Sequence, residues 1–270
     1  MIGTTNTTVE LPSVYVISGE EITRFCYLTG DTNKAHQGDR AAVPAFFLKF
    51  LAKRMYDAIP ESIDRTVSYH KSHFRGVIRR DEPFIIFPIK EEKLSDGKTV
   101  FEYNIKKDLN RTDIKEEDKI VGNGEIHYTT IPAQPGRVRY DSHGQPAKKE
   151  PVIVKLYDSQ VQGVQEVLRL SQDSDLAARL ATAVSLSSKA LLALFDEQSG
   201  RQPYFGSQKL FVYDNIEDKL KDEFALNVRT EESAGKVRAP PVHIRGEGKN
   251  GNRIFDLTAT IFYFDGTPTA

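Results

Sequence analysis

The chain has 270 residues, of which 39% are hydrophobic and 28% are charged, and its formal net charge is −1. This composition is typical of a globular protein, and the near-zero charge excludes bulk attraction to nucleic acid or to an anionic membrane. The single cysteine, Cys26, excludes an intramolecular disulfide. Because we find no run of about 18 apolar residues and no secretory signal, we expect a cytoplasmic protein that does not enter a membrane.

The first half of the sequence predicts a short strand, two helices and four further strands. The short strand is expected at Ser13–Ile17. A first helix at Gly19–Leu28 is expected to stop at Gly30, because glycine suits the left-handed position after a helix. A longer helix is expected from about Asp39 to Ala58, with Pro44 in its first turn, where a missing N–H costs little. Four β-rich segments separated by turn residues follow, at Thr66–Phe74, Phe84–Glu91, Val100–Lys107 and Ile120–Ile131.

An acid and an imidazole lie five residues apart in the loop between the two helices, at Asp31 and His36. Outside a helix, this spacing lets both side chains reach one small molecule or water. Asp31 would hold or deprotonate it, and His36 would position it or pass a proton onward. The alternative is structural: Asp31 would bond its own backbone, and His36 would be a satisfied loop or core histidine. Asn33, between them, is expected mainly to shape the loop.

The second half of the sequence predicts the same order of elements. It begins with a strand at Val152–Asp158, a helix at Val161–Leu170 and a long helix at Asp175–Gln198. Four strands complete it, at Ser207–Tyr213, Phe224–Thr230, Lys236–Gly246 and Arg253–Phe264. Residues 132–150 are rich in proline, glycine and charge, and they predict a linker between domains at 1–131 and 151–270.

The two halves also share a weak internal repeat, in which Val14–Asp31 aligns with Leu156–Asp173. Asp31 then meets Asp173, whereas His36 meets Ala178. The second copy would therefore keep the helix and the loop but lack the imidazole. The order of elements predicts an α+β unit in which an antiparallel sheet wraps one helix. Because a single copy would leave sheet edges unpaired, we expect the two copies to pair side by side.

The loop and the helix before it resemble a family signature. MaoC-like, (R)-specific enoyl-CoA hydratases and related β-hydroxyacyl dehydratases of the hot-dog fold carry a helix ending in Phe-Ala-x-x-Ser/Thr-Gly-Asp-x-Asn-Pro-x-His. This chain matches at Phe25, Thr29, Gly30, Asp31, Asn33 and His36. It departs from the signature at Lys34, where proline is usual, and at Cys26, where alanine is common.

The resemblance implies a double hot-dog, in which two antiparallel sheets each wrap a long central helix. Such a chain is a pseudo-dimer by itself, and homodimerisation is left open. In the relatives, a glycine near the start of the central helix gives a backbone N–H to the thioester oxygen. Here Ala45 occupies that slot, so a backbone N–H around Ala45 or Phe46 is expected to take this role.

The function implied is that of a hydro-lyase of fatty acid metabolism. Asp31 and His36 would hold one water and add it across the C2–C3 bond of an enoyl thioester, or remove it from a 3-hydroxyacyl thioester. Asn33 and Arg75 would complete the substrate site. The resemblance implies no metal and no separate cofactor, because coenzyme A or phosphopantetheine is part of the substrate. If the thioester is carried by a protein, that partner would be an acyl carrier protein.

Other polar residues allow two readings each. His70 and His73 lie three positions apart on a predicted strand and point to opposite faces, so no metal site is predicted. Cys26 lies among apolar helix residues and is expected to be buried rather than nucleophilic. Four basic residues form either a solvated face or a site for the phosphates of coenzyme A or a carrier, namely Lys71, Arg75, Arg79 and Arg80.

Two other functions compete with the hydratase. A hot-dog thioesterase would use a carboxylate on or near the long helix, and Asp57 and Glu197 are the candidates. A non-catalytic acyl-thioester-binding protein is the second alternative. It is favoured by the departures at Lys34 and Ala45 and by the missing imidazole at Ala178.

Overall fold

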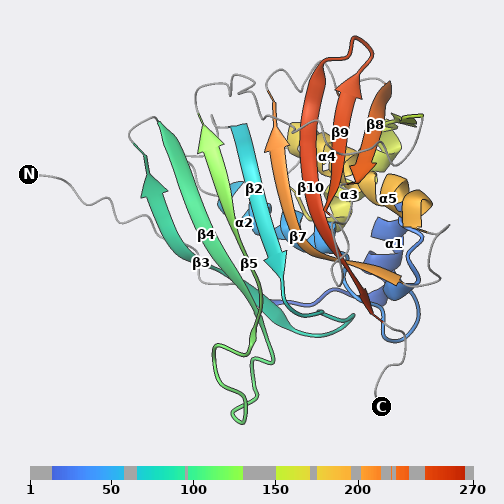
Figure 1. Ribbon diagram of the computed structural model, residues 1–270. Helices are drawn as coiled ribbons and strands as arrows, with labels where there is room; N and C mark the ends of the chain where they lie inside the picture. Colours follow the sequence, from blue (N-terminus) through green and yellow to red (C-terminus); the bar gives the residue numbers. More distant parts are fainter. Residues whose placement is uncertain are drawn as a thin grey trace, which may run out of the picture.

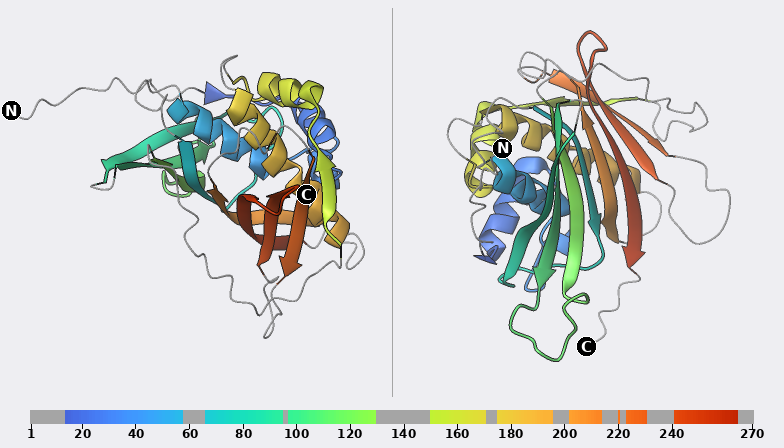
Figure 2. Two further views of the ribbon diagram at one scale, coloured as in Figure 1. Left: turned by 90° about the horizontal axis from the view of Figure 1, so that it is seen from above. Right: turned by 90° about the vertical axis from the view of Figure 1, so that its left-hand side faces the viewer.

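The computed structural model describes residues 14–57, 66–94, 97–129, 150–170, 175–195, 202–213, 220, 223–230 and 241–264. Within these residues, ten strands form one antiparallel sheet, and the helices cover one of its faces (Figure 1). Figure 2 shows that the sheet curves around the helices. Most of the predicted linker at 132–150, and also Asp173, lie outside the described residues. None of the described helices combines the length and the apolar character needed to cross a bilayer.

The first half contains the elements that the sequence predicts, most of them with shifted ends, and one short 3₁₀ helix that was not predicted. They are β1 (Val14–Tyr15), α1 (Gly19–Thr29), the short 3₁₀ helix η1 (Lys34–His36), α2 (Ala45–Asp57), β2 (Thr66–Phe74), β3 (Phe84–Lys93), β4 (Lys98–Lys107) and β5 (Ile120–Thr129). The long helix begins later than expected, because Pro44 directly precedes it and the residues before Pro44 bond to other segments. Among these bonds, the Val43 N–H donates to the Ile78 carbonyl at 2.8 Å.

The second half repeats this order. It contains β6 (Val152–Lys155), α3 (Asp158–Val167), α4 (Asp175–Ser185), α5 (Ser187–Phe195), β7 (Gln202–Val212), β8 (Glu223–Thr230), β9 (Val242–Gly248) and β10 (Arg253–Phe264). The prediction of one helix over Asp175–Gln198 was wrong, because the helix breaks at Leu186. Serines at 185, 187 and 188 flank the break, and serine hydroxyls compete with helical backbone bonding.

The strand order is mirrored about the middle of the sheet: β1-β3-β4-β5-β2-β7-β10-β9-β8-β6. The two halves join where β2 pairs with β7, with Lys71 opposite Lys209. The expected side-by-side pairing of the two copies is confirmed, and it joins their two expected sheets into one continuous sheet. The physical reason is that pairing β2 with β7 satisfies the backbone groups of two strands that would otherwise be open edges.

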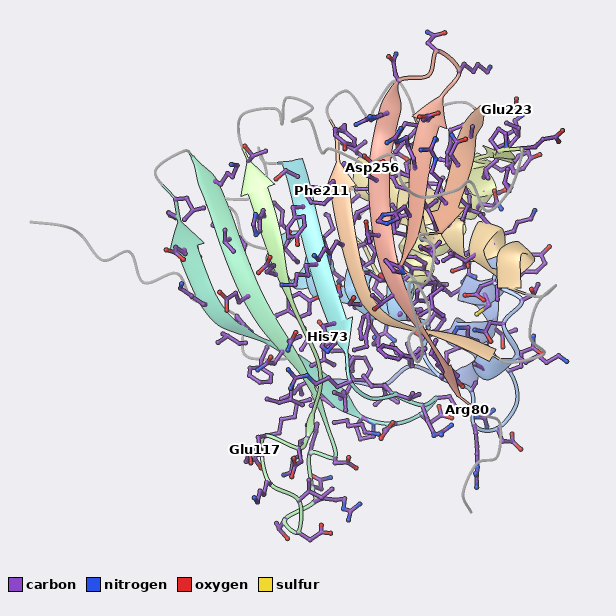
Figure 3. All side chains as sticks on the ribbon, in the orientation of Figure 1. His73, Arg80, Glu117, Phe211, Glu223 and Asp256 are labelled. Atoms are coloured by element: carbon purple, nitrogen blue, oxygen red, sulfur yellow. The ribbon has the colours of Figure 1, made fainter. Side chains whose placement is uncertain are left out.

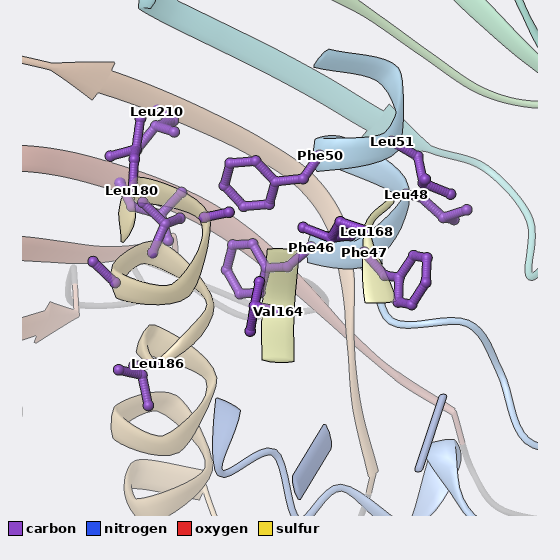
Figure 4. Close-up of a cluster of buried hydrophobic side chains, with 14 of the residues drawn as sticks. Phe46, Phe47, Leu48, Phe50, Leu51, Val164, Leu168, Leu180, Leu186 and Leu210 are labelled. Atoms are coloured by element: carbon purple, nitrogen blue, oxygen red, sulfur yellow. The ribbon is translucent and has the colours of Figure 1, made fainter. Parts of the chain in front are cut away.

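Helices from both halves pack together on the concave face of the sheet. Figure 4 shows Phe46 and Phe50 extending from α2 towards the helix that carries Leu180, whereas Leu48 and Leu51 extend the other way. All five side chains are buried. Truncating one such phenylalanine to alanine typically costs about 3–5 kcal/mol, so this contact holds the two halves together as firmly as a domain core does.

The first helices of the two halves, α1 and α3, also pack against each other. Gly163 of α3 leaves room for Leu28, because a Cβ at Gly163 would come within 2.8 Å of the Leu28 side chain. The Gln160 side-chain amide donates to the Leu28 carbonyl at 3.1 Å. The second half therefore provides a hydrogen-bond donor to a backbone carbonyl at the end of α1, where the loop that carries Asp31 and His36 begins.

Candidate active site

The backbone at the end of α1 fixes where Asp31 lies. Gly30 adopts the left-handed conformation, with φ of 65°. The Gly30 N–H donates to the Tyr27 carbonyl at 3.4 Å, and the Asp31 N–H donates to the Cys26 carbonyl at 2.9 Å. This pair of bonds is the Schellman arrangement of a helix C-terminus. The predicted glycine stop is confirmed, and it anchors the Asp31 backbone directly to the helix.

Two side chains then shape the loop between Asp31 and His36. The Asp31 Oδ1 atom accepts the Asn33 N–H at 3.1 Å, and the Asn33 Oδ1 atom accepts the Ala35 N–H at 3.0 Å. Asn33 thereby caps the 3₁₀ helix η1, which ends at His36. Lys34 stands at the first position of this helix, where the family signature has proline. The Asn33 cap supplies local order that proline would otherwise provide.

The imidazole of His36 has a defined tautomer. Its Nδ1 atom lies 2.7 Å from the Ala42 carbonyl oxygen, so Nδ1 must carry a proton and donate it. In the neutral ring, Nε2 then has a free lone pair. This Nε2 atom lies 3.7 Å from Asp31 Oδ2, and the two side chains are 8% and 4% exposed. The distance exceeds a direct hydrogen bond, and it is short enough for one water molecule to lie about 2.8 Å from both atoms.

The carbonyl that orients His36 is itself held in place. The Ala42 N–H donates to the Ala35 carbonyl at 2.8 Å, and the Arg80 N–H donates to the Ala41 carbonyl at 2.8 Å. The Arg79 guanidinium donates to the carbonyl of Arg40, also at 2.8 Å. The segment after His36 is therefore fastened to the segment that follows β2.

This arrangement divides the basic cluster that the sequence predicts. Arg79 and Arg80 both contact the segment after His36: Arg79 donates to the Arg40 carbonyl, and the Arg80 guanidinium lies 3.5 Å from Asp39 Oδ1. Lys71 lies on β2 opposite Lys209, at the join of the two halves. Only Arg75 of the four basic residues lines the cavity beside His36.

That cavity has a volume of about 380 Å³ and lies between the two halves. His73, near the C-terminal end of β2, and Arg75, directly after the strand, form one part of its wall. Figure 3 shows His73 near this end of the strand. The apolar wall of the cavity comes from Val43, Ala45 and Leu48 of the first half and from Tyr204, Phe205 and Phe262 of the second half. The second-half residues carry no signal in the sequence that would have identified them.

Asp31 faces a different and much smaller space. This cavity measures about 10 Å³, which is room for about one water molecule. Tyr204 and Phe205 line both cavities and so stand between them. The remaining wall is made by Asn33 and by Ser188, Leu191, Leu192 and Ile261 of the second half. A third depression, open and about 740 Å³ in volume, borders His36 on the side of Gly38 and Arg80.

The start of α2 faces the larger cavity. Ala45 is the first residue of α2 and lines the cavity, and backbone N–H groups in a first helical turn have no partner within the helix. The helix dipole adds a partial positive charge there. The Phe46 side chain is instead 1% exposed, and its ring lies 5.2 Å from that of Phe205. The Phe46 side chain therefore packs behind the cavity wall.

Cys26 and His70 lie in the core. Burial and the nearby charge of Asp31 raise the pKa of Cys26, so the thiol is kept neutral. His70 Nε2 lies 3.0 Å from the Tyr103 hydroxyl. Burial, and then the charges of Lys49 and Lys53, lower the pKa of His70. No three His, Cys, Asp or Glu side chains in the described part of the chain are grouped so as to hold a metal ion.

Lys49 is a buried charge-bearing residue that the sequence analysis missed. It lies on α2 with no exposed surface, and its Nζ donates to the His70 carbonyl at 2.8 Å. Burial lowers the pKa of Lys49. The available signal was a lysine inside the apolar run of residues 41–52, which placed it on the buried side of an amphipathic helix.

No family model and no curated protein matches the sequence. Solved structures do match the fold. A MaoC-like dehydratase superposes with a TM-score of 0.63 at 11% identity, covering 95% of this chain and 96% of that chain. A MaoC-like dehydratase from Phytophthora capsici gives 0.59 at 12% identity, over 98% and 100%. An acyl-ACP thioesterase from Bacteroides thetaiotaomicron gives 0.51 at 9% identity, over 93% and 97%. The resemblance seen in the loop thus extends to the architecture, and the chain has the fold of the MaoC-like dehydratases.

Proposed function

We propose that the protein is an acyl-thioester hydratase or dehydratase. It adds water across the C2–C3 bond of an enoyl thioester, or removes water from the 3-hydroxyacyl thioester. The observation that carries the proposal is the buried pair of Asp31 Oδ2 and His36 Nε2, 3.7 Å apart beside a cavity. The fold shared with MaoC-like dehydratases supports the same reaction class.

In the hydration direction, one water lies between the carboxylate of Asp31 and Nε2 of His36. Asp31 accepts one hydrogen bond and orients the water, while the unprotonated Nε2 takes a proton as the oxygen bonds to C3. The electron pair of the C2–C3 double bond moves towards the thioester carbonyl. The proton then passes from Nε2 to C2, so water is added without net change at the enzyme. The Ala42 carbonyl stabilises His36 while its ring is charged.

The negative charge that develops on the thioester oxygen needs donors nearby. Backbone N–H groups at the start of α2, around Ala45, suit this role because they lack helical partners and add the helix dipole. Ala45 lines the same cavity as His36. An alanine N–H donates as well as a glycine N–H does, although the methyl group narrows the approach.

We further interpret the mirrored halves as a double hot-dog, with domains at 1–131 and 151–270. The first half supplies Asp31 and His36, and the second supplies cavity wall through Tyr204 and Phe205. In this interpretation the site is complete within one chain. The substrate is a coenzyme A or carrier-protein thioester, with Arg75 beside its charged arm. We propose that it acts in fatty acid metabolism in the cytoplasm.

A thioesterase is the second candidate, because the fold is also similar to that of an acyl-ACP thioesterase. Such an enzyme activates water against the thioester carbonyl rather than against C3. The side chains of Asp57 and Glu197 lie outside the described residues. Among the described carboxylates, Asp31 lies beside His36 and is aimed at the smaller cavity, so it would have to be the base.

Incubation with crotonyl-CoA distinguishes the candidates. We expect loss of the enoyl absorbance without release of free thiol, and we expect Asp31→Asn to abolish most of it. Asp118→Asn is the matched control, because this exposed carboxylate lies between β4 and β5 and lines neither cavity. Release of thiol would establish the thioesterase instead. Binding without either reaction would establish a non-catalytic thioester-binding protein.

A further inference from the structure

The carbonyl that orients His36 is fixed from the opposite side of its own peptide group. The Ala42 carbonyl accepts the proton of His36 Nδ1 at 2.7 Å, and the Val43 N–H of the same peptide group donates to the Ile78 carbonyl at 2.8 Å. A trans peptide group is planar, and its C=O and N–H point in opposite directions. The bond to Ile78 therefore sets the direction in which the Ala42 carbonyl points.

A second peptide group continues this chain of hydrogen bonds. The Ile78 carbonyl belongs to the peptide group that carries the Arg79 N–H, and this N–H donates to Glu82 Oε2 at 2.8 Å. Ala42 and Arg79 also form an isolated antiparallel β-bridge, which holds the two peptide groups side by side. Two peptide groups thus connect the carboxylate of Glu82 to the imidazole of His36.

Glu82 is itself held at the end of this chain. Its Oε1 lies 3.2 Å from Lys107 Nζ, which also donates to the Val77 carbonyl at 3.0 Å. The Glu82 N–H donates to the Arg79 carbonyl at 3.2 Å and closes a turn in which Asp81 has φ of 60°. The Glu82 and Lys107 side chains are only 23% and 25% exposed, so the carboxylate is partly shielded from solvent.

A carboxylate in this place has two effects on the imidazole. It fixes both peptide planes, so the Ala42 carbonyl stays directed at Nδ1. It also strengthens that carbonyl as an acceptor, because hydrogen bonds in series polarise one another. The proton is therefore confined to Nδ1, and the lone pair is kept on Nε2, the atom that lies 3.7 Å from Asp31.

We propose that Glu82 is a positioning residue for His36, which acts through the two peptide groups and lines neither cavity. Its effect on the imidazole follows from the hydrogen bonds alone, whereas its effect on catalysis rests on the proposed hydratase function. The cavity side of the same segment has separate support, since the N–H groups of Arg75 and Gly76 donate to the Val121 carbonyl at 2.8 and 3.2 Å. Loss of Glu82 should therefore change kcat more than KM.

The imidazole ¹⁵N resonances of the full chain test the proposal, because protonated and unprotonated ring nitrogens give distinct signals. At about pH 8, where a histidine side chain is ordinarily neutral, His36 should be in the Nδ1–H form, with its signals assigned by comparison with His36→Ala. Glu82→Ala should populate the Nε2–H form. Glu82→Gln should populate it less, because the glutamine oxygen can still accept the Arg79 N–H.

Kinetics of crotonyl-CoA hydration give the second measurement. Glu82→Ala should lower kcat roughly 10-fold and change KM less than about threefold, because a misdirected imidazole lacks the base at Nε2. Glu247→Ala is the matched control, since this carboxylate lies on β9, is 27% exposed and lines neither cavity. It should change neither the ¹⁵N signals of His36 nor kcat.

Lys107→Met provides a second variant if Glu82→Ala does not fold by thermal unfolding. It leaves the carboxylate without its lysine partner and should shift His36 in the same direction, by a smaller amount. An unchanged His36 tautomer in Glu82→Ala, or in Lys107→Met where the first variant is unfolded, would overturn the proposal. Absence of hydration in the unmodified protein would overturn the proposed function instead, and the ¹⁵N signals would still decide the role of Glu82.

Discussion

The two halves of the molecule share a strand order but differ in how the first helix connects to the central one. In the first half, a loop with its own 3₁₀ turn separates α1 from α2 and carries Asp31 and His36. In the second half, Ala178, which aligns with His36 in sequence, lies inside α4 and is fully buried. Its carbonyl accepts the Thr182 hydroxyl at 2.7 Å. The proposed chemistry therefore depends on the loop between the two helices, because the strand order is common to both halves and the loop is not.

The second half still contributes to the site. It supplies Tyr204 and Phe205 to both cavities. It also supports the loop that carries Asp31 and His36, since the Gln160 side chain donates to the Leu28 carbonyl and the Lys189 side chain packs against Gly30. In the proposed function, the first half provides the reactive groups, and the second half provides cavity walls and support.

Among the changes that test this comparison, removing residues 151–270 should have the largest effect on folding and activity. It deletes β7, the partner of β2, and exposes both a sheet edge and the apolar face of α2. We expect aggregation or a forced dimer of first halves, measured by size-exclusion chromatography, with no hydration activity. A monomeric fragment with full activity would contradict the shared site.

Gly30→Ala should impair the first-half loop specifically. Gly30 has φ of 65°, and an alanine in this conformation costs about 1–2 kcal/mol. Because Asp31 is anchored through this turn, we also expect a fall in kcat of more than about tenfold. Gly251→Ala is the matched control, since Gly251 has φ of 70° and open space around it, in the turn between β9 and β10. It should lose similar stability by urea unfolding while keeping its activity; equal activities would disprove the anchoring role.

The smallest expected effect concerns the pH dependence of stability. The folded protein holds the pKa of His70 well below 6.5, so the unfolded chain gains a proton there as the pH falls and the folded chain does not. Stability should therefore decrease below about pH 6.5, by about 1 kcal/mol between pH 7.5 and 5.5 from this residue. Urea unfolding of His70→Gln should lack that part of the decrease. An unchanged pH dependence in the variant would contradict the assignment.

Local signals in the sequence predict much of this fold. Period-two alternation and turn residues located β2 and β10 at their observed ends, and Gly30 located the end of α1. The family resemblance then assigned Asp31 and His36 to one site. The break in the long helix at Leu186 was missed, because helical periodicity continues across the flanking serines.

Long-range features could not be predicted in the same way. The pairing of β2 with β7 joins segments from different halves, and no local pattern specifies it. The same is true of Tyr204 and Phe205, which reach the site only because of that pairing. Phe46 was expected near the substrate only through its backbone N–H, as the family resemblance implies, and its side chain packs against Phe205 in the core.

The central claim is that Asp31 and His36 handle one water, and a double-mutant cycle tests it most directly. Rates of crotonyl-CoA hydration would be measured for Asp31→Asn, His36→Ala and the double variant, with thermal unfolding as a check on folding. Each single change should reduce the rate by roughly 10²–10⁴-fold, and the double variant should lose little more than the worse single variant. Losses below about tenfold in both single variants, or losses that multiply in the double variant, would contradict the claim.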